Sequence, residues 1–225
     1  MSSQINSKMR RKGRRTFIEN YRFSPSFEAK LREELGDARH VDTALEGLRA
    51  WYLACLCAGG ELIGMPSKTV DIAWHEMILR TREYHGFCQR AFGQYLHHSP
   101  DSTLDIPMSA ILPETLRIVE ENKLSMVLFT ADEDTGIPGG YLWSATELHS
   151  MRDRYAADKA VGSAKRKRRA AWGTSGGVYS AGASDGGFWG GFFGDGGGGG
   201  AGDGDGGGGC GGGGGCGGGG CGGGG

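Results

Sequence analysis

Residues 70–100 have the sequence VDIAWHEMILRTREYHGFCQRAFGQYLHHSP, and this stretch decides the fold that we predict. Its apolar side chains recur every three or four residues, which is the period of one face of an α-helix. The stripe consists of Val70, Trp74, Met77, Ile78, Thr81, Tyr84, Cys88 and Phe92. Met65-Pro66-Ser67 precedes it and Gly93 follows it. We therefore expect one helix of about 26 residues, about 39 Å long, as the axis of a small domain.

Similar patterns predict helices on both sides of this axis. Start signals such as Ser24-Pro25, stop signals such as Gly36 and Gly59-Gly60, and a capping box formed by Ser144 and Glu147 mark their ends. The expected helices cover residues 24–36, 41–58, 113–123 and 144–157. Residues 125–130 (SMVLFT) form either a strand or a buried connector, because periodicity does not decide so short an apolar run. The expected fold is mainly α: a single compact domain of about five helices around the long central one.

Composition divides the chain into four regions. More than half of its 45 glycines lie in residues 176–225, which contain too little apolar surface to offset the entropy of ordering them. We expect a disordered basic arm at 1–15, a helical domain at 16–160, a basic linker at 161–175 and a disordered Gly/Cys-rich tail at 176–225.

The formal net charge of −1 conceals two basic clusters. One consists of Arg10, Arg11, Lys12, Arg14 and Arg15, and the other of Lys165, Arg166, Lys167, Arg168 and Arg169. Such segregation predicts a polyanionic or acidic partner, and aromatic residues such as Trp172 and Trp189 can stack on nucleic-acid bases. The alternative is that both clusters are solvated arms.

The sequence contains no apolar segment that suits a membrane or an export signal. The basic start lacks a following apolar run, and no apolar run is long enough to span a bilayer. We therefore expect a soluble, cytoplasmic protein.

The residues of the central stretch also carry a family resemblance. The spacing of Asp71, Trp74, His75, Tyr84, Cys88, His97 and His98 resembles that of the glycine-rich domain-containing protein-like family, in particular its bacterial members. YRFSP at 21–25, GMPS at 64–67, FTADEDTGIPGG at 129–140 and the Gly/Cys tail support the resemblance, which covers roughly residues 16–155. It implies that these seven residues form a functional motif, and it implies no particular activity.

Part of this motif suits a metal ion. Asp71 and His75 are four residues apart, so they share one face of the expected helix. Together with His97 or His98 they would offer a carboxylate and two imidazoles to Zn²⁺ or another transition metal. The structural alternative is that Asp71 interacts favourably with the helix dipole, forms a hydrogen bond with His75 and binds no metal.

The cysteines fall into two groups. Cys88 lies on the apolar stripe, where a thiol usually packs as a small hydrophobic group. Cys210, Cys216 and Cys221 are separated by five and four glycines. They suit a soft metal, intermolecular disulfides, enzymatic cyclisation of Gly-Cys steps, or an inert tail.

The chain shows no nucleophile elbow and no phosphate-binding loop between a strand and a helix. We therefore expect no catalytic residue, and the first functional hypothesis is a non-catalytic interaction or scaffold module with a protein partner. A metal-binding protein and a nucleic-acid-associated protein are the alternatives.

Overall fold

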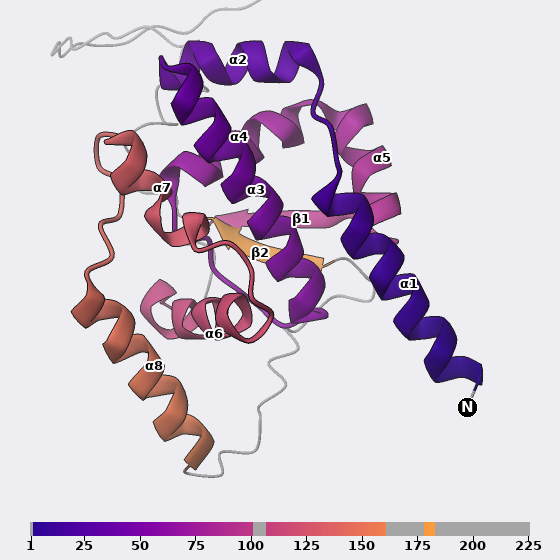
Figure 1. The fold of residues 1–225 in the computed structure, drawn as a ribbon, viewed down its shortest axis with the longest axis vertical. Helices are drawn as coiled ribbons and strands as arrows, with labels where there is room; N and C mark the ends of the chain where they lie inside the picture. Colours follow the sequence, from indigo (N-terminus) through magenta and orange to yellow (C-terminus); the bar gives the residue numbers. More distant parts are fainter. Residues whose placement is uncertain (1, 101–106, 161–177, 183–225) are drawn as a thin grey trace, which may run out of the picture. The chain divides into compact units, whose positions relative to one another are not determined.

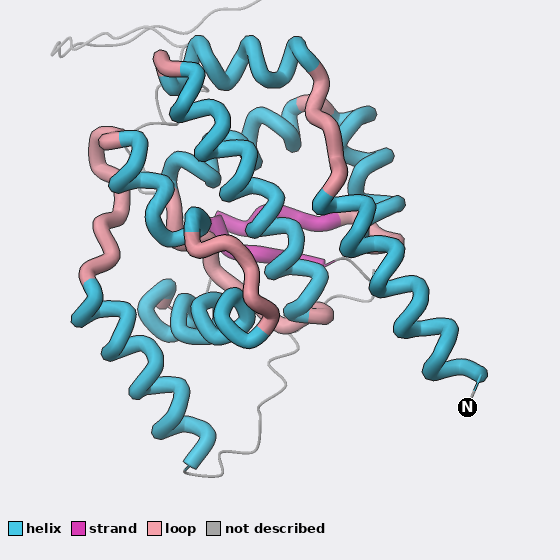
Figure 2. The backbone as a smooth tube through the Cα atoms, in the orientation of Figure 1, coloured by secondary structure: helices cyan, strands magenta, loops and turns pink. Residues whose placement is uncertain are grey.

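The structure is a computed structural model that describes residues 2–100, 107–160 and 178–182. These residues form eight helices and two short strands, so the mainly helical fold is confirmed (Figure 1, Figure 2). The helices are α1 (Ser2–Glu19), α2 (Pro25–Leu35), α3 (Ala38–Ala58), α4 (Lys68–Leu79), α5 (Thr81–Ala91), α6 (Met108–Glu121), α7 (Val127–Thr135) and α8 (Ala145–Ala160). The strands are β1 (Leu96–Pro100) and β2 (Val178–Gly182). None of the described helices is long and apolar enough to cross a membrane.

The central helix is α3, which packs against α1, α2, α4, α6 and α7. It begins at the N-cap Asp37, whose side chain accepts a hydrogen bond from the backbone of Arg39, and ends at Gly59 in a left-handed conformation. Trp51 and Tyr52 from α3 are completely buried. At Gly47 a Cβ atom would overlap the side chain of Val70, so the absence of a side chain at Gly47 allows α3 and α4 to pack closely.

The prediction of one long helix over residues 67–93 is wrong. The helix breaks at Arg80, whose φ of −82° and ψ of 59° lie outside the helical range. The guanidinium of Arg80 donates hydrogen bonds to the hydroxyl and the carbonyl of Ser26 at 3.0 and 2.9 Å, which ties this residue to α2. The apolar stripe stays in phase across the break, and periodicity therefore gives no sign of it.

The structure also differs from the expectation of a disordered arm at residues 1–15, because α1 includes residues 2–15. Ile18 is buried at its end, and Arg11 donates to the carbonyl of Cys57 near the C-terminus of α3. The guanidinium of Arg14 lies against Gly93, just beyond α5. Arginine side chains suit these positions, since the last carbonyls of a helix carry partial negative charge.

The remaining helices settle two further predictions. The sequence left residues 125–130 as a strand or a buried connector. In the structure α7 starts within this segment, at Val127, and Leu128 and Phe129 are buried. The capping box of α8 is confirmed: the hydroxyl of Ser144 accepts from the backbone of Glu147 at 3.2 Å, and the Glu147 carboxylate accepts from the backbone of Ser144 at 2.9 Å.

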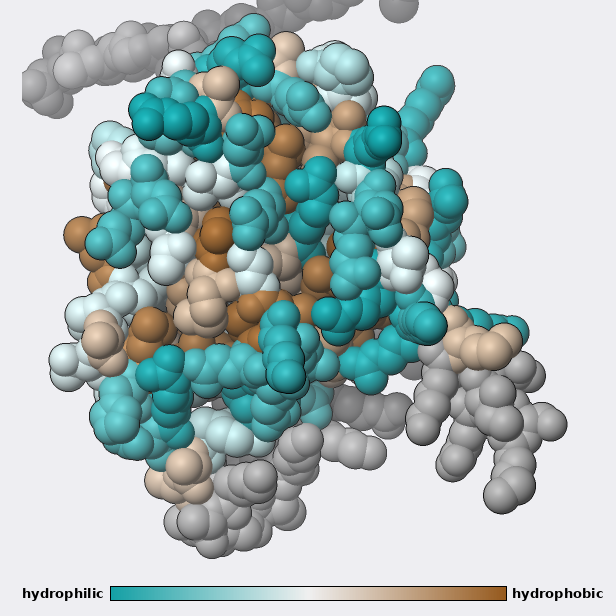
Figure 3. All heavy atoms as spheres, in the orientation of Figure 1, coloured by the Kyte–Doolittle hydropathy of each residue, from teal (hydrophilic) through white to brown (hydrophobic). Residues whose placement is uncertain are grey.

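The two strands form a parallel pair, and the register places His98 opposite Ser180. In Figure 3, hydrophobic residues form patches on the visible face, and hydrophilic residues surround them. The linker, the basic cluster at 165–169 and the tail cysteines Cys210, Cys216 and Cys221 lie outside the described residues, so the predictions for them stay predictions.

Candidate metal-binding site

The start of α4 positions two of the predicted site residues. Ser67 is its N-cap, and its hydroxyl accepts a hydrogen bond from the backbone of Val70 at 3.1 Å. Asp71 follows in the first turn, buried at 2% exposure, and its amide donates to the carbonyl of Ser67 at 3.0 Å. His75 lies one turn later on the same face, as its spacing predicts.

The third residue comes from β1, which a short chain of hydrogen bonds holds beside α4 and α5. The indole of Trp74 donates to the hydroxyl of Tyr84 at 3.1 Å, and that hydroxyl donates to the carbonyl of Leu96 at 2.6 Å. Side chains alternate along a strand, so His98 shares the face of the buried Leu96 and His97 takes the other face. This alternation selects His98 from the two histidines that the sequence left open.

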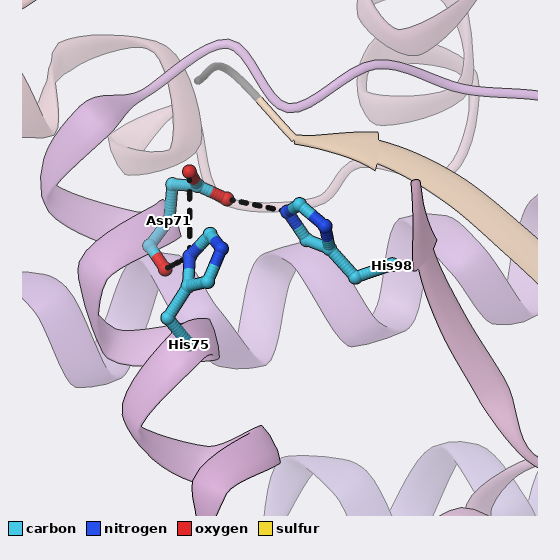
Figure 4. Close-up of side chains that lie close together, drawn as sticks. All are labelled: Asp71, His75 and His98. Atoms are coloured by element: carbon cyan, nitrogen blue, oxygen red, sulfur yellow. Dashed lines mark hydrogen bonds and ion pairs between the residues drawn. The ribbon is translucent and has the colours of Figure 1, made fainter. Parts of the chain in front are cut away.

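Asp71, His75 and His98 meet between α4 and β1 (Figure 4). Their potential ligand atoms all lie within 4.8 Å of one another, and the two imidazole centroids are 4.4 Å apart. One carboxylate oxygen of Asp71 is 3.5 Å from Nε2 of His98, and the other is 3.5 Å from Nδ1 of His75. Among the described residues, these three form the group that can hold a metal ion.

Two atoms of this cluster are buried without a hydrogen bond to any described residue: Oδ1 of Asp71 and Nε2 of His98. Burying an unpaired polar group costs about 1–3 kcal/mol, so native proteins seldom leave two of them face to face. Their separation of 3.5 Å is too long for a good hydrogen bond. Two ligands that are each about 2.1 Å from a tetrahedral ion would lie about 3.4 Å apart.

A further hydrogen bond suits His75 to the same role. Nδ1 of His75 lies 2.8 Å from the backbone carbonyl of Asp71, which can only accept. Nδ1 therefore carries the proton, and the lone pair is on Nε2. Metal-binding histidines commonly donate their second ring N–H to a carbonyl or carboxylate in this way.

The other residues of the predicted motif have packing roles. Trp74 is fully buried, and its ring centroid lies 5.5 Å from that of Trp51 and 4.7 Å from that of His98. Cys88 is fully buried, and burial raises the pKa of its thiol to about 11. His97 lies outside the cluster, with its ring centroid 4.9 Å from that of Tyr95.

The basic residues of α1 differ in their contacts. Arg11 and Arg14 contact the ends of α3 and α5, and Arg15 pairs with Glu19 at 2.7 Å. Arg10, Arg11 and Lys12 are exposed. The second basic cluster, at 165–169, lies outside the described residues. The hypotheses of a polyanion-binding protein and of a scaffold module both stay predictions.

Sequence analysis missed the role of Asp132, a carboxylate of α7 that is only 1% exposed. It accepts four hydrogen bonds of 2.7–2.8 Å, from the hydroxyl of Ser67 and from the backbone amides of Lys68, Thr69 and Tyr141. Asp132 thus caps the start of α4 from a distant part of the chain. The segment 129–140, which contains Asp132, entered the sequence analysis only through the family resemblance. No local spacing links Asp132 to residues 67–69, which are far from it in the sequence.

The fold and the cluster define a mainly helical domain in which two histidines and one carboxylate converge between a helix and a strand. The chain belongs to the UCP032817-like family, whose profile matches residues 13–164. No curated protein and no solved structure gives a significant match. The resemblance to the glycine-rich domain-containing protein-like family stays a prediction.

Proposed function

We propose that this protein binds one divalent transition-metal ion through Asp71, His75 and His98. The observation that carries the proposal is the pair of buried atoms, Oδ1 of Asp71 and Nε2 of His98, which face each other at 3.5 Å without hydrogen-bond partners. A cation between them would satisfy both atoms at once. A direct hydrogen bond would instead bring them to about 2.7–2.9 Å.

The ligand set favours Zn²⁺. Two imidazoles and one carboxylate suit zinc or ferrous iron, and the separation of 3.5 Å is close to the tetrahedral spacing that zinc prefers. Three protein ligands leave one position for water or a further ligand. The carboxylate of Asp71 would offset part of the charge of the ion in a site that is largely shielded from solvent.

The test is the metal content of the full chain, purified without chelator and analysed by native and elemental mass spectrometry. One metal ion per chain is expected, and His98→Ala should abolish it. His97→Ala is the matched control, because it changes the neighbouring residue of the same strand on the opposite face. It should keep the metal.

Circular dichroism of each variant separates metal loss from unfolding. Two results would contradict the proposal: a wild-type protein that neither carries metal nor takes up Zn²⁺ after reconstitution, or equal loss of metal in His97→Ala and His98→Ala.

A further inference from the structure

β1 connects the candidate site with a segment that is distant in sequence. The side chain of His98 lies on the face of β1 that is directed toward Asp71 and His75. The backbone of β1 pairs with β2 (Figure 1). The pairing matches Leu96 with Val178, His98 with Ser180 and Pro100 with Gly182. The position of β1 therefore affects both the cluster and the strand pairing.

A two-stranded sheet of five residues per strand needs support from elsewhere in the fold. One support is the hydroxyl of Tyr84, which holds the carbonyl of Leu96 at the first residue of β1. The next described anchor along the same face is the side chain of His98, two residues later. Without metal the polar part of this anchor is weak, since Oδ1 of Asp71 lies 3.5 Å from Nε2 of His98 and neither atom has a hydrogen bond.

Without metal, the buried Oδ1 of Asp71 and Nε2 of His98 favour any movement that lets water reach them. The simplest such movement draws β1 away from α4, because Asp71 belongs to a helix that is capped and packed. Such a movement would also disturb the pairing with β2. A bound ion would give both atoms a partner, so the movement of β1 would no longer be favoured, and it would hold His98 against α4.

We propose that metal binding at Asp71, His75 and His98 stabilises the docking of Val178–Gly182 on β1. This inference rests on the proposed function and adds its regulation: the ion sets whether the segment that precedes the glycine-rich residues is attached to the helical domain. Because coupling between two binding events is reciprocal, the docked strand must also raise the affinity for the metal.

The first test is hydrogen–deuterium exchange of the full chain, after chelation and again with saturating Zn²⁺. Amides of residues 96–99 and 178–182 should exchange about tenfold more slowly with Zn²⁺, within the usual range of coupling between sites. Peptides from α3 provide the internal reference. His98→Ala should abolish the protection, whereas His97→Ala should retain it.

The second test runs in the opposite direction. Ser180→Pro removes an amide from β2 and should weaken Zn²⁺ affinity about tenfold, whereas Ser180→Ala keeps the backbone and should leave affinity unchanged. Zn²⁺ affinity is measured by competition with a chromophoric chelator.

The outcomes separate the two proposals. If Zn²⁺ binds but neither slows exchange at 178–182 nor responds to Ser180→Pro, the coupling is overturned and the metal site stands. If the chain binds no Zn²⁺ at all, the metal site is overturned and the coupling with it.

Discussion

The carboxylate of Asp132 provides the sharpest test of how α4 is held. One of its oxygens accepts from the hydroxyl of Ser67 and the amide of Thr69, and the other accepts from the amides of Lys68 and Tyr141. Asp132→Asn keeps the shape of the side chain but replaces one oxygen with an amide group that donates. Whichever oxygen is lost, two donors of this site lose their acceptor.

Each unpaired buried donor costs about 1–3 kcal/mol, so the loss of two acceptor contacts should lower the unfolding free energy by at least about 2 kcal/mol. This is a large share of the total for a domain, which is typically about 5–15 kcal/mol. A loss of about 2 kcal/mol corresponds to a fall in melting temperature of roughly 4–8 °C for a protein of this size.

The assay is urea unfolding followed by circular dichroism, with the m-value as a check for two-state behaviour. Asp134→Asn is the matched control, because Asp134 lies two positions further along α7, is exposed, and accepts a hydrogen bond from the hydroxyl of Thr130 at 3.2 Å. It should change the free energy by less than about 0.5 kcal/mol. A loss below about 1 kcal/mol for Asp132→Asn, or equal losses in the two variants, would refute the reasoning.

Three further predictions concern the core. Gly47→Ala places a methyl group against Val70 and should cost about 1–3 kcal/mol in urea unfolding, and an unchanged midpoint would argue against the close approach of α3 and α4. The Cys88 thiol, with its pKa raised to about 11, is almost entirely protonated at pH 8; its alkylation by iodoacetamide should accelerate as the pH rises toward that value, and the partly exposed Cys57 should be labelled first in peptide maps. Labelling of both cysteines at equal rates at pH 8 would contradict this. Tyr84→Phe leaves a buried indole N–H and a strand carbonyl without their partner and should cost at least about 2 kcal/mol in thermal or urea unfolding. A variant as stable as the wild type would show that these bonds are replaced by water.

The sequence predicted part of the candidate site correctly. The four-residue spacing of Asp71 and His75 placed them on one helix face, because the helical period is a local property. Which of His97 and His98 joins them depended on a strand that the sequence did not predict. The β1 segment is short, and its partner begins nearly 80 residues after it ends, a pairing that local periodicity does not reveal.

The same division applies to the helices. Several ends were predicted from single residues, such as Gly36 and Gly59, both of which adopt the left-handed conformation. The break at Arg80 was missed, because its cause is a pair of hydrogen bonds to Ser26 in another helix.

The sequence by itself determined the mainly helical class, the boundaries of α2, α3 and α8 to within a few residues, and the shared face of Asp71 and His75. These features depend on hydrogen bonds and side-chain periods that span at most a few residues. Only the tertiary structure decided the break at Arg80, the capping of α4 by Asp132 and the approach of His98 to Asp71. Each of these joins residues far apart in the chain, and the free energy that favours them arises only when packing has already brought the segments together.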